Sequence, residues 1–298
     1  MTINPSEHDD DASHDAVDAA VDDAIARARA AMDAFAGASQ ARVDEVVTAV
    51  AWLLYQPHCA RALAELAVRD TGLGNVADKT RKNQRKTFGA LRDLMRAKTV
   101  GVIESDPARG LVKYAKPVGV VAAITPSTNP QATPANKAMM ALKGANAIVV
   151  APSPSGWRST DAGVGAMRDA LAKVGAPADL VQILPQPVTR DATARLMRRA
   201  DLVVATGSQN NVRAAYRSGT PCVGVGAGNV PVIIDSSADL DDAARKIHDS
   251  KTFDNATSCS SENALIILDE VYEDALAALA RVGGNRADAD ERERIMRC

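Results

Sequence analysis

This sequence is poor in aromatic residues, in net charge and in long apolar runs. Only 3% of its 298 residues are aromatic, so a core must be built mainly from Ala, Val, Leu and Ile. A formal net charge of −2 provides no basic field for nucleic acid or for an anionic membrane surface. The longest apolar runs, such as residues 118–124, are far too short to cross a bilayer. We therefore expect a soluble, cytoplasmic protein that has neither nucleic acid nor a membrane as its partner.

Cysteine is scarce as well, and its spacing argues against two classes of site. The four cysteines lie far apart and match no pattern of metal ligands, so no metal site is expected. Thiols dispersed in this way favour a reduced, cytosolic protein over a disulfide framework. The N-terminus carries Asp9, Asp10 and Asp11 and has no charged-then-apolar signal sequence. With 298 residues, 46% of them hydrophobic, the chain is long enough for two domains.

The first third of the chain has the periodicity of helices. Residues 1–14 are polar and acidic, and we expect them to be disordered. Apolar residues then recur at three- and four-residue steps, which predicts helices over 15–35 and 40–55 and a third that ends at residue 70. A basic stretch over 76–98 predicts a fourth helix. Its cations indicate either phosphate binding or, as we favour, a solvated helix face; they are Lys79, Arg81, Lys82, Arg85 and Lys86.

From residue 113 onward, short apolar runs alternate with helical segments. Continuous apolar runs are typical of strands that are covered on both faces. Each of four such strands is followed by a helix, and the strands are expected at 118–124, 147–150, 181–184 and 202–205. This alternation predicts an α/β fold with a doubly wound parallel sheet. A second α/β unit is expected from two further strands, at 230–234 and 264–268, and the helices that follow them.

Loops that leave the C-terminal ends of parallel strands are the expected ligand sites of such a sheet. Three loops qualify, at 125–130, 152–155 and 206–208. In the third, Gly207 allows close backbone approach and Ser208 stands at a helix N-terminus, where free amides and the helix dipole favour a pyrophosphate. A simple helix cap is the competing interpretation. The glycines at 224–228 do not form a Rossmann fingerprint, because a strand follows them where that motif requires a helix.

A small, polar segment at residues 251–263 surrounds Cys259 and ends where an apolar strand begins. Small neighbours such as Ser258 and Ser260 allow the chain to fold tightly around a substrate and to present the sulfur to it. A buried or incidental thiol is the alternative, since a free cysteine usually behaves as a small hydrophobic residue. Cys259 is therefore a candidate nucleophile whose assignment depends on the rest of the chain.

Six motifs that occur in order provide that context. Together they resemble the aldehyde dehydrogenase superfamily, and within it the CoA-acylating branch, over residues 24–284. Acetaldehyde and sulfoacetaldehyde dehydrogenases belong to this branch, and the details at 208–211 and 257–261 are most similar to the sulfoacetaldehyde enzymes. The motifs are KPVGVV at 116–121, PSTNP at 126–130, ATGS at 205–208, GVGAGNVP at 224–231, KTFDN at 251–255 and CSSEN at 259–263.

The resemblance implies an organisation for the chain. It implies a dinucleotide-binding domain over residues 15–228, in which 100–116 form an arm that reaches toward a partner subunit of a homo-oligomer. Residues 229–298 then correspond to the N-terminal part of a catalytic domain. Members of the family continue well beyond the position of Cys298, so we expect the chain to be a fragment or a truncated, inactive product.

The resemblance also implies roles for individual residues. Cys259 matches the nucleophile whose thiolate adds to the aldehyde carbon. Asn129 matches the residue whose side-chain amide, with the Cys259 backbone N–H, stabilises the developing alkoxide, a contact worth about 3 kcal/mol. Hydride then passes to NAD or NADP; many relatives place a lysine near the position of Ser153, so the choice of cofactor stays open. The residues matched to cofactor binding are Ile124, Thr125, Pro126, Ser153, Gly207, Ser208 and Gly226.

Val225 stands where the resemblance places a glutamate general base in hydrolytic members of the family. A valine cannot accept a proton, so the thioester should persist until the thiol of coenzyme A attacks it, which gives an acyl-CoA. Two alternatives stay open: hydrolysis to the free acid or an inactive nucleotide-binding remnant. Glu262 is the candidate to activate water in the first, although we favour a capping or structural role for this carboxylate. The sequence leaves the short aldehyde substrate open, with acetaldehyde and sulfoacetaldehyde as candidates.

Overall fold

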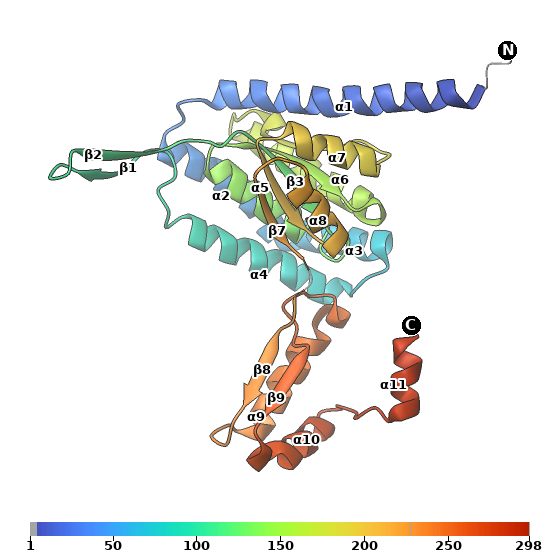
Figure 1. Ribbon diagram of the computed structural model, residues 1–298. Helices are drawn as coiled ribbons and strands as arrows, with labels where there is room; N and C mark the ends of the chain where they lie inside the picture. Colours follow the sequence, from blue (N-terminus) through green and yellow to red (C-terminus); the bar gives the residue numbers. More distant parts are fainter. Residues whose placement is uncertain (1–4, 227, 298) are drawn as a thin grey trace. The chain divides into compact units, whose positions relative to one another are not determined.

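The computed structural model describes residues 5–226 and 228–297 (Figure 1). The chain forms two compact units, the first ending at Ala227 and the second beginning at Gly228, and each is described by itself. Both units combine helices with parallel strands, which confirms the expected α/β fold class. Their assignment as a cofactor domain over 15–228 and a catalytic domain over 229–298 stays a prediction.

The first unit begins with helices. Residues 5–14, expected to be disordered, are helical in the structure and form the first turns of α1 (Pro5–Phe35), whereas residues 1–4 lie outside the described residues. Proline suits the first position of a helix, and no glycine or further proline interrupts the chain before residue 35. The three helices that follow are α2 (Gln40–Tyr55), α3 (Pro57–Thr71) and α4 (Val76–Leu94). Within the described ranges, none of the helices has the length and apolar character needed to traverse a bilayer.

A five-stranded parallel sheet forms the centre of the first unit. Its strand order is β5-β4-β3-β6-β7, so the chain builds outward from β3 in one direction and then returns to build in the other. The border between β3 and β6 is therefore the point at which the topology switches, as a doubly wound sheet requires. The strands are β3 (Val120–Thr125), β4 (Ala147–Pro152), β5 (Val181–Ile183), β6 (Leu202–Thr206) and β7 (Cys222–Val225).

Helices cover both faces of this sheet, which explains why its central strands are continuously apolar. All six residues of β3 and all six of β4 are buried. Helix α5 contacts β3 and β4 and packs against α2, whereas α1 contacts β4 and α7. Right-handed crossovers place α5 and α6 on one face and the helices after the switch on the other. These four helices are α5 (Ala132–Lys143), α6 (Trp157–Lys173), α7 (Arg190–Arg199) and α8 (Gln209–Arg217).

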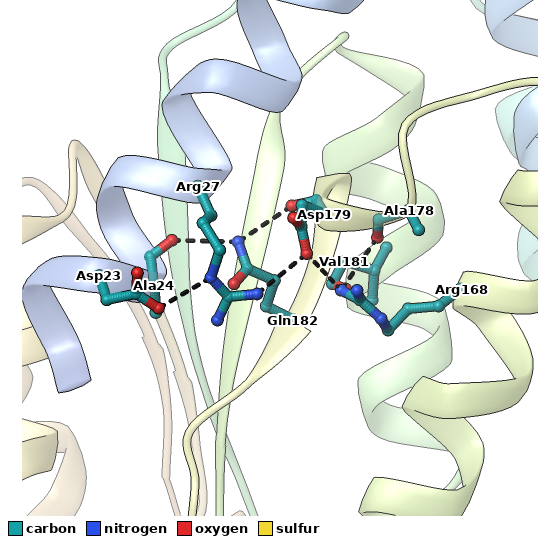
Figure 2. Close-up of polar contacts among 8 residues, drawn as sticks. All are labelled: Asp23, Ala24, Arg27, Arg168, Ala178, Asp179, Val181 and Gln182. Carbon is teal, nitrogen blue, oxygen red and sulfur yellow. Dashed lines mark hydrogen bonds and ion pairs between the residues drawn. The ribbon is translucent and has the colours of Figure 1, made fainter.

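Polar contacts fix α1 to the sheet, as Figure 2 shows. The carboxylate of Asp179 accepts from Arg27 at 3.1 Å and from Arg168 at 2.7 Å. Close by, Gln182 Nε2 donates to the Ala24 carbonyl oxygen at 3.0 Å. Asp179 thus joins the first helix to α6, and its contact with Arg27 spans 152 positions of sequence.

A hairpin formed by β1 (Gly101–Asp106) and β2 (Leu111–Ala115) extends from the helices of the first unit (Figure 1). An isolated two-stranded hairpin is marginal in water, and this one leaves several large apolar side chains exposed. They are Val102, Ile103, Leu111, Val112 and Tyr114. The hairpin corresponds to the expected arm at 100–116, and its contact with a partner subunit stays a prediction.

The second unit is built on two parallel strands, β8 (Pro231–Ile234) and β9 (Ala264–Ile267). Helix α9 (Leu240–Thr252) connects them and packs against α10 (Tyr272–Arg281). A further helix, α11 (Ala289–Met296), starts with a capping box between Asp288 and Glu291. The sequence predicts only a charged end there; the helix was missed because it has no apolar stripe, although the capping box was readable.

Candidate functional site

A cavity of about 660 Å³ lies at the C-terminal ends of β3 and β4 in the first unit. The N-terminal turns of α7 and α8 also contribute to its wall. This is the edge of the sheet where open α/β folds bind ligands, beside the topological switch. Among its lining residues are Ile124, Thr125, Ser153, Arg190, Ser208 and Asn211.

Two helix N-termini at this cavity favour an anionic ligand. Ser208 caps α8 by accepting from the Asn211 backbone N–H at 3.3 Å, and Thr189 caps α7 by accepting from the Ala192 N–H at 3.0 Å. The amides of a first turn that lack helical partners, together with the positive end of the helix dipole, stabilise a phosphate or carboxylate. Arg190 and Asp191 both line the cavity with opposite charges, so the preference for an anion comes from the two helix N-termini.

The residues matched to cofactor binding divide into two groups. Ile124, Thr125, Ser153 and Ser208 line the cavity together. Pro126, Gly207 and Gly226 do not belong to its lining, although the first two adjoin residues that do. A cofactor-binding role for all seven residues stays a prediction.

Two of these positions are glycines at close approaches of the chain, one with an unusual backbone conformation and one beside the flexible Gln209 side chain. Gly207 has φ 154° and donates its N–H to the Val225 carbonyl oxygen at 3.2 Å, which joins the loop after β6 to the end of β7. A Cβ on Gly226 would lie 2.9 Å from Gln209 Oε1, at the first residue of α8. Both glycines therefore bring the end of β7 close to the start of α8.

The loop that carries Asn129 is held by two lysines of α4. Lys82 Nζ donates to Asn129 Oδ1 at 2.8 Å, and Lys79 Nζ donates to the Thr128 carbonyl oxygen at 3.1 Å. The expectation of a solvated basic face is therefore wrong for these two residues, which are 4% and 3% exposed. Their helix face is covered by a loop that follows almost 50 residues later in the chain, and periodicity alone does not reveal this.

Lys137 is buried and links the two strands at the switch point. Its Nζ donates to the carbonyl oxygens of Ile124, on β3, and Val204, on β6, at 2.7 Å each. Burial lowers the pKa of Lys137 from 10.5 to about 7. The Lys137 ammonium group is hydrogen-bonded to two main-chain carbonyl oxygens, so its role is to hold β3 and β6 together.

Cys259 lies in an exposed turn of the second unit. The turn is preceded by three residues in the left-handed region, Asp254, Asn255 and Ala256, with φ of 53°, 53° and 60°. The Thr257 hydroxyl lies 2.8 Å from the Asp254 carbonyl oxygen and 2.7 Å from its carboxylate, a bifurcated hydrogen bond across the turn. Left-handed residues other than glycine are costly, and such strain concentrates at functional sites.

Accessibility distinguishes Cys259 from the cysteine of the sheet. Cys222, on β7, is half-buried, and burial raises the pKa of its thiol. The thiolate is the reactive form of cysteine, so Cys222 is a poor nucleophile. Cys259 is exposed to solvent and therefore open to an incoming carbonyl compound.

Glu262, three residues after Cys259, is the acid expected to activate water in the hydrolytic alternative. It lines a cavity of about 350 Å³ beside β8 and α9. Its Oε2 is buried and has no hydrogen-bond partner among the described residues. A buried carboxylate oxygen without a protein partner is free to accept a hydrogen bond from a water molecule, so the alternative keeps a physical basis.

Asn129 and Cys259 belong to different units. Asn129 follows β3 in the first unit, and Cys259 precedes β9 in the second. Their expected meeting at one aldehyde carbon therefore stays a prediction.

The sequence model that describes the "Aldehyde dehydrogenase family" matches residues 2–285 of the chain. The chain belongs to the aldehyde dehydrogenase family. It is 60% identical over 271 residues to the sulfoacetaldehyde dehydrogenase (acylating) of Cupriavidus necator, an alignment that covers 91% of this chain and 55% of that protein. The chain thus spans about half the length of this curated relative.

Two solved structures are similar as well. An acetylating aldehyde dehydrogenase from Geobacillus thermoglucosidasius matches with a TM-score of 0.89 and 38% identity, over 94% of this chain and 62% of that one. A propionaldehyde dehydrogenase from Rhodopseudomonas palustris, solved with bound CoA and an acylated cysteine, matches with a TM-score of 0.80 and 26% identity, over 91% and 61%. These relatives confirm the resemblance to the acylating branch of the family.

Proposed function

We propose that this chain carries the cofactor site and the nucleophile of a CoA-acylating aldehyde dehydrogenase whose substrate is a short aldehyde, with sulfoacetaldehyde as the first candidate. The substrate proposal is supported by the 60% identity to an acylating sulfoacetaldehyde dehydrogenase. The acylating outcome is supported by one observation above all, the valine at position 225. Val225 ends β7, and no acidic residue occurs between 222 and 231.

The proposed reaction starts at Cys259. Its thiol, which is exposed to solvent, loses a proton to water, and the sulfur adds to the aldehyde carbon, so that the carbonyl oxygen becomes an alkoxide. The Asn129 amide and the Cys259 backbone N–H stabilise this oxygen by hydrogen bonds. Collapse of the alkoxide expels the hydride of the former aldehyde and leaves a thioester on Cys259. The thiol of coenzyme A then attacks the thioester carbonyl, which releases the acyl-CoA and returns the Cys259 sulfur.

The cavity of the first unit fits the nucleotide that this reaction needs. When bound, NAD or NADP supplies the acceptor for the hydride. The first turns of α8 and α7 would hold its phosphates, and the Ser153 hydroxyl lies on the same wall for a sugar hydroxyl. Arg190 and Asp191 line the cavity as well; the first would favour the additional phosphate of NADP and the second would oppose it, so both coenzymes are tested.

Hydrolysis to the free acid is the second candidate function, because Glu262 has a buried carboxylate oxygen with no partner among the described residues. The two functions differ in their need for coenzyme A. NAD(P)H formation from sulfoacetaldehyde, acetaldehyde or succinate semialdehyde is followed by absorbance, with and without coenzyme A. The acylating function predicts one turnover without coenzyme A and many with it. Sustained turnover without coenzyme A, abolished by Glu262→Gln, establishes hydrolysis instead.

Cys259→Ala tests whether the chain catalyses hydride transfer from an aldehyde through the Cys259 thiol. We expect it to abolish the single-turnover burst of NAD(P)H, a loss of about three orders of magnitude or more, while Cys59→Ala, on α3, leaves the burst unchanged. Thiol labelling of Cys259 should also slow in the presence of aldehyde. Without a burst in the wild type and without protection by any of the aldehydes, the chain is an inactive nucleotide-binding remnant.

A further inference from the structure

Two buried lysines of α4 contact consecutive residues of the loop after β3. Lys82 reaches the side chain of Asn129 at 2.8 Å, whereas Lys79 reaches the main chain of Thr128 at 3.1 Å. They stand three residues apart and therefore on the same face of the helix. An ammonium group enters a protein interior only if it is well hydrogen-bonded, because its desolvation is costly. Two of them beneath one short loop indicate a specific need at that loop.

Lys82 determines the orientation of the Asn129 side-chain amide, that is, whether Oδ1 or Nδ2 faces away from α4. An ammonium group has donors and no acceptor, so only the amide oxygen can face it. The nitrogen Nδ2 must then point away from Lys82, and within the described ranges it has no hydrogen-bond partner. A positive charge on Oδ1 also polarises the amide and makes its N–H groups stronger donors. An asparagine that serves an alkoxide must donate through this nitrogen.

We propose that Lys82 is a positioning residue, which orients and polarises the Asn129 amide so that Nδ2 donates to the oxygen that becomes the alkoxide. This inference rests on the proposed function, since the role of Asn129 comes from there. Lys82 contacts Asn129 and not the substrate itself. Its removal should therefore reduce the stabilisation of the transition state more than the affinity for the aldehyde. The effect is therefore expected on kcat, with KM little changed.

Lys79 provides a matched control within the same helix. It has the same charge, the same helix face and the same burial, and it contacts the same loop, but its partner is a carbonyl oxygen that cannot rotate. Lys79→Met therefore tests support of the loop alone. Lys82→Met tests that support together with orientation of the amide, and Lys82→Arg retains a donor for Asn129 Oδ1.

The first experiment reads the amide directly and needs no turnover. The chain is labelled with ¹⁵N-asparagine, and the side-chain NH₂ signals of Asn129 are assigned as the pair that Asn129→Ala removes. We expect Lys82→Met to move this pair because the charge on Oδ1 is lost, and Lys79→Met to move it far less. If Lys82→Met leaves the pair in place, or if the two variants move it equally, the proposal is overturned.

The second experiment measures the single-turnover rate of hydride transfer. We expect Asn129→Ala to lower it about 100-fold, Lys82→Met about 10-fold and Lys79→Met less than about threefold. Lys82→Arg should recover most of the rate. The double variant Lys82→Met/Asn129→Ala should be no slower than Asn129→Ala alone, because Lys82 acts through Asn129. Additive losses would show that Lys82 acts elsewhere and would overturn the proposal.

The two experiments separate the inference from the function on which it rests. A moved amide signal in Lys82→Met, combined with full activity in Asn129→Ala, refutes the role of Asn129 in the proposed function while Lys82 still orients the amide. An unmoved signal combined with a slow Asn129→Ala variant leaves the function intact and refutes Lys82. A chain without turnover refutes the activity, and the amide signals alone then decide the orientation.

Discussion

The two units of the chain differ in how much apolar surface each buries. The first has one continuous core, to which α1, α2, α5, α6 and the strands β3, β4, β5 and β6 contribute, while the half-buried Cys222 of β7 packs against it. In the second, the described buried apolar residues are Ile234, Ala244, Ala275 and Ala278, while Ile233 on β8 is 71% exposed. Burial of apolar surface is the main source of stability. The cavity proposed for the cofactor therefore lies in the unit with the larger core, and the proposed nucleophile lies in the unit with the smaller one.

The largest effect on the difference in stability between the two units is expected from a substitution at Gly119, which precedes the central strand β3 of the first unit. Its φ is 127°, and a Cβ there would lie 2.1 Å from Oδ2 of Asp201, the oxygen that accepts from the Val120 N–H. We expect Gly119→Ala to lower the free energy of unfolding by about 2–4 kcal/mol. Urea unfolding measured by tryptophan fluorescence reports this unit alone, because Trp52 and Trp157 both belong to it.

Gly165 supplies the control for that substitution. It lies within α6, and a Cβ there would meet nothing within 4 Å. Gly165→Ala should therefore leave the stability unchanged or raise it by up to about 1 kcal/mol, since alanine favours the helix. Equal losses at the two glycines would contradict the explanation by steric conflict with Asp201.

The buried Lys137 predicts a pH dependence that belongs to the first unit. Its pKa is about 7 in the folded chain and near its ordinary value of 10.5 when unfolded, so between these values the unfolded chain holds more protons. Stability should therefore rise with pH, by about 2 kcal/mol from pH 7 to pH 9. Lys137→Met should remove this rise, and Lys173→Met, at an exposed lysine of α6, should keep it. A rise that persists in Lys137→Met would assign it to other groups.

At a left-handed residue of the second unit, Ala256, we expect a substitution to increase local stability and not to decrease it. Ala256 has φ 60° and an exposed side chain, so Ala256→Gly relieves backbone strain and removes little packing. We expect stabilisation of the turn before Cys259 by about 1 kcal/mol, measured as slower hydrogen exchange over residues 253–257. Ala277→Gly, the same change at an exposed position of the right-handed helix α10, should cost about 1 kcal/mol. The same sign for both substitutions would contradict the left-handed assignment.

The smallest expected effect concerns the contacts between α1 and the sheet. Asp179 pairs with both Arg27 and Arg168, but all three side chains are about a third or more accessible. Asp179→Asn should cost about 0.5–1 kcal/mol, and less at high salt, because exposed ion pairs are weak and screened. Asp23→Asn, which removes only the pair with Arg27 inside α1, should cost about 0.3 kcal/mol. A loss above that of Gly119→Ala would show that α1 is held by charge more than by its buried face.

The parts of the fold that the sequence predicts are those with a strong local pattern. Strands β3 and β4 were found because burial on both faces makes them continuously apolar. Strand β7 was missed, because its residues alternate between half-buried and exposed and include a glycine. Its place at the edge of the sheet depends on β6, which no local pattern reveals.

In the candidate site, too, residues that follow from a local pattern were predicted, and residues that depend on distant parts of the chain were missed. The alternation of strands and helices places Ser153 and Ser208 in loops that follow strands, and the structure brings both to one cavity. Arg190 was missed at this cavity because the loops expected to bind ligands were those at 125–130, 152–155 and 206–208, and the start of α7 was not among them. Lys82 was misread as a solvated cation, because its partner Asn129 is distant in sequence and a helical pattern does not show which face a later loop covers.

The walls of the 660 Å³ cavity come from segments that are far apart in the chain, at the ends of β3 and β4 and the starts of α7 and α8. Such a site exists only after the first unit has folded, so the unfolded chain has no comparable affinity for a nucleotide. By thermodynamic linkage, a nucleotide at 100 times its dissociation constant would then add about 2.7 kcal/mol to the stability of the unit. Melting temperatures recorded with NAD and with NADP would rank the two coenzymes in the absence of any aldehyde.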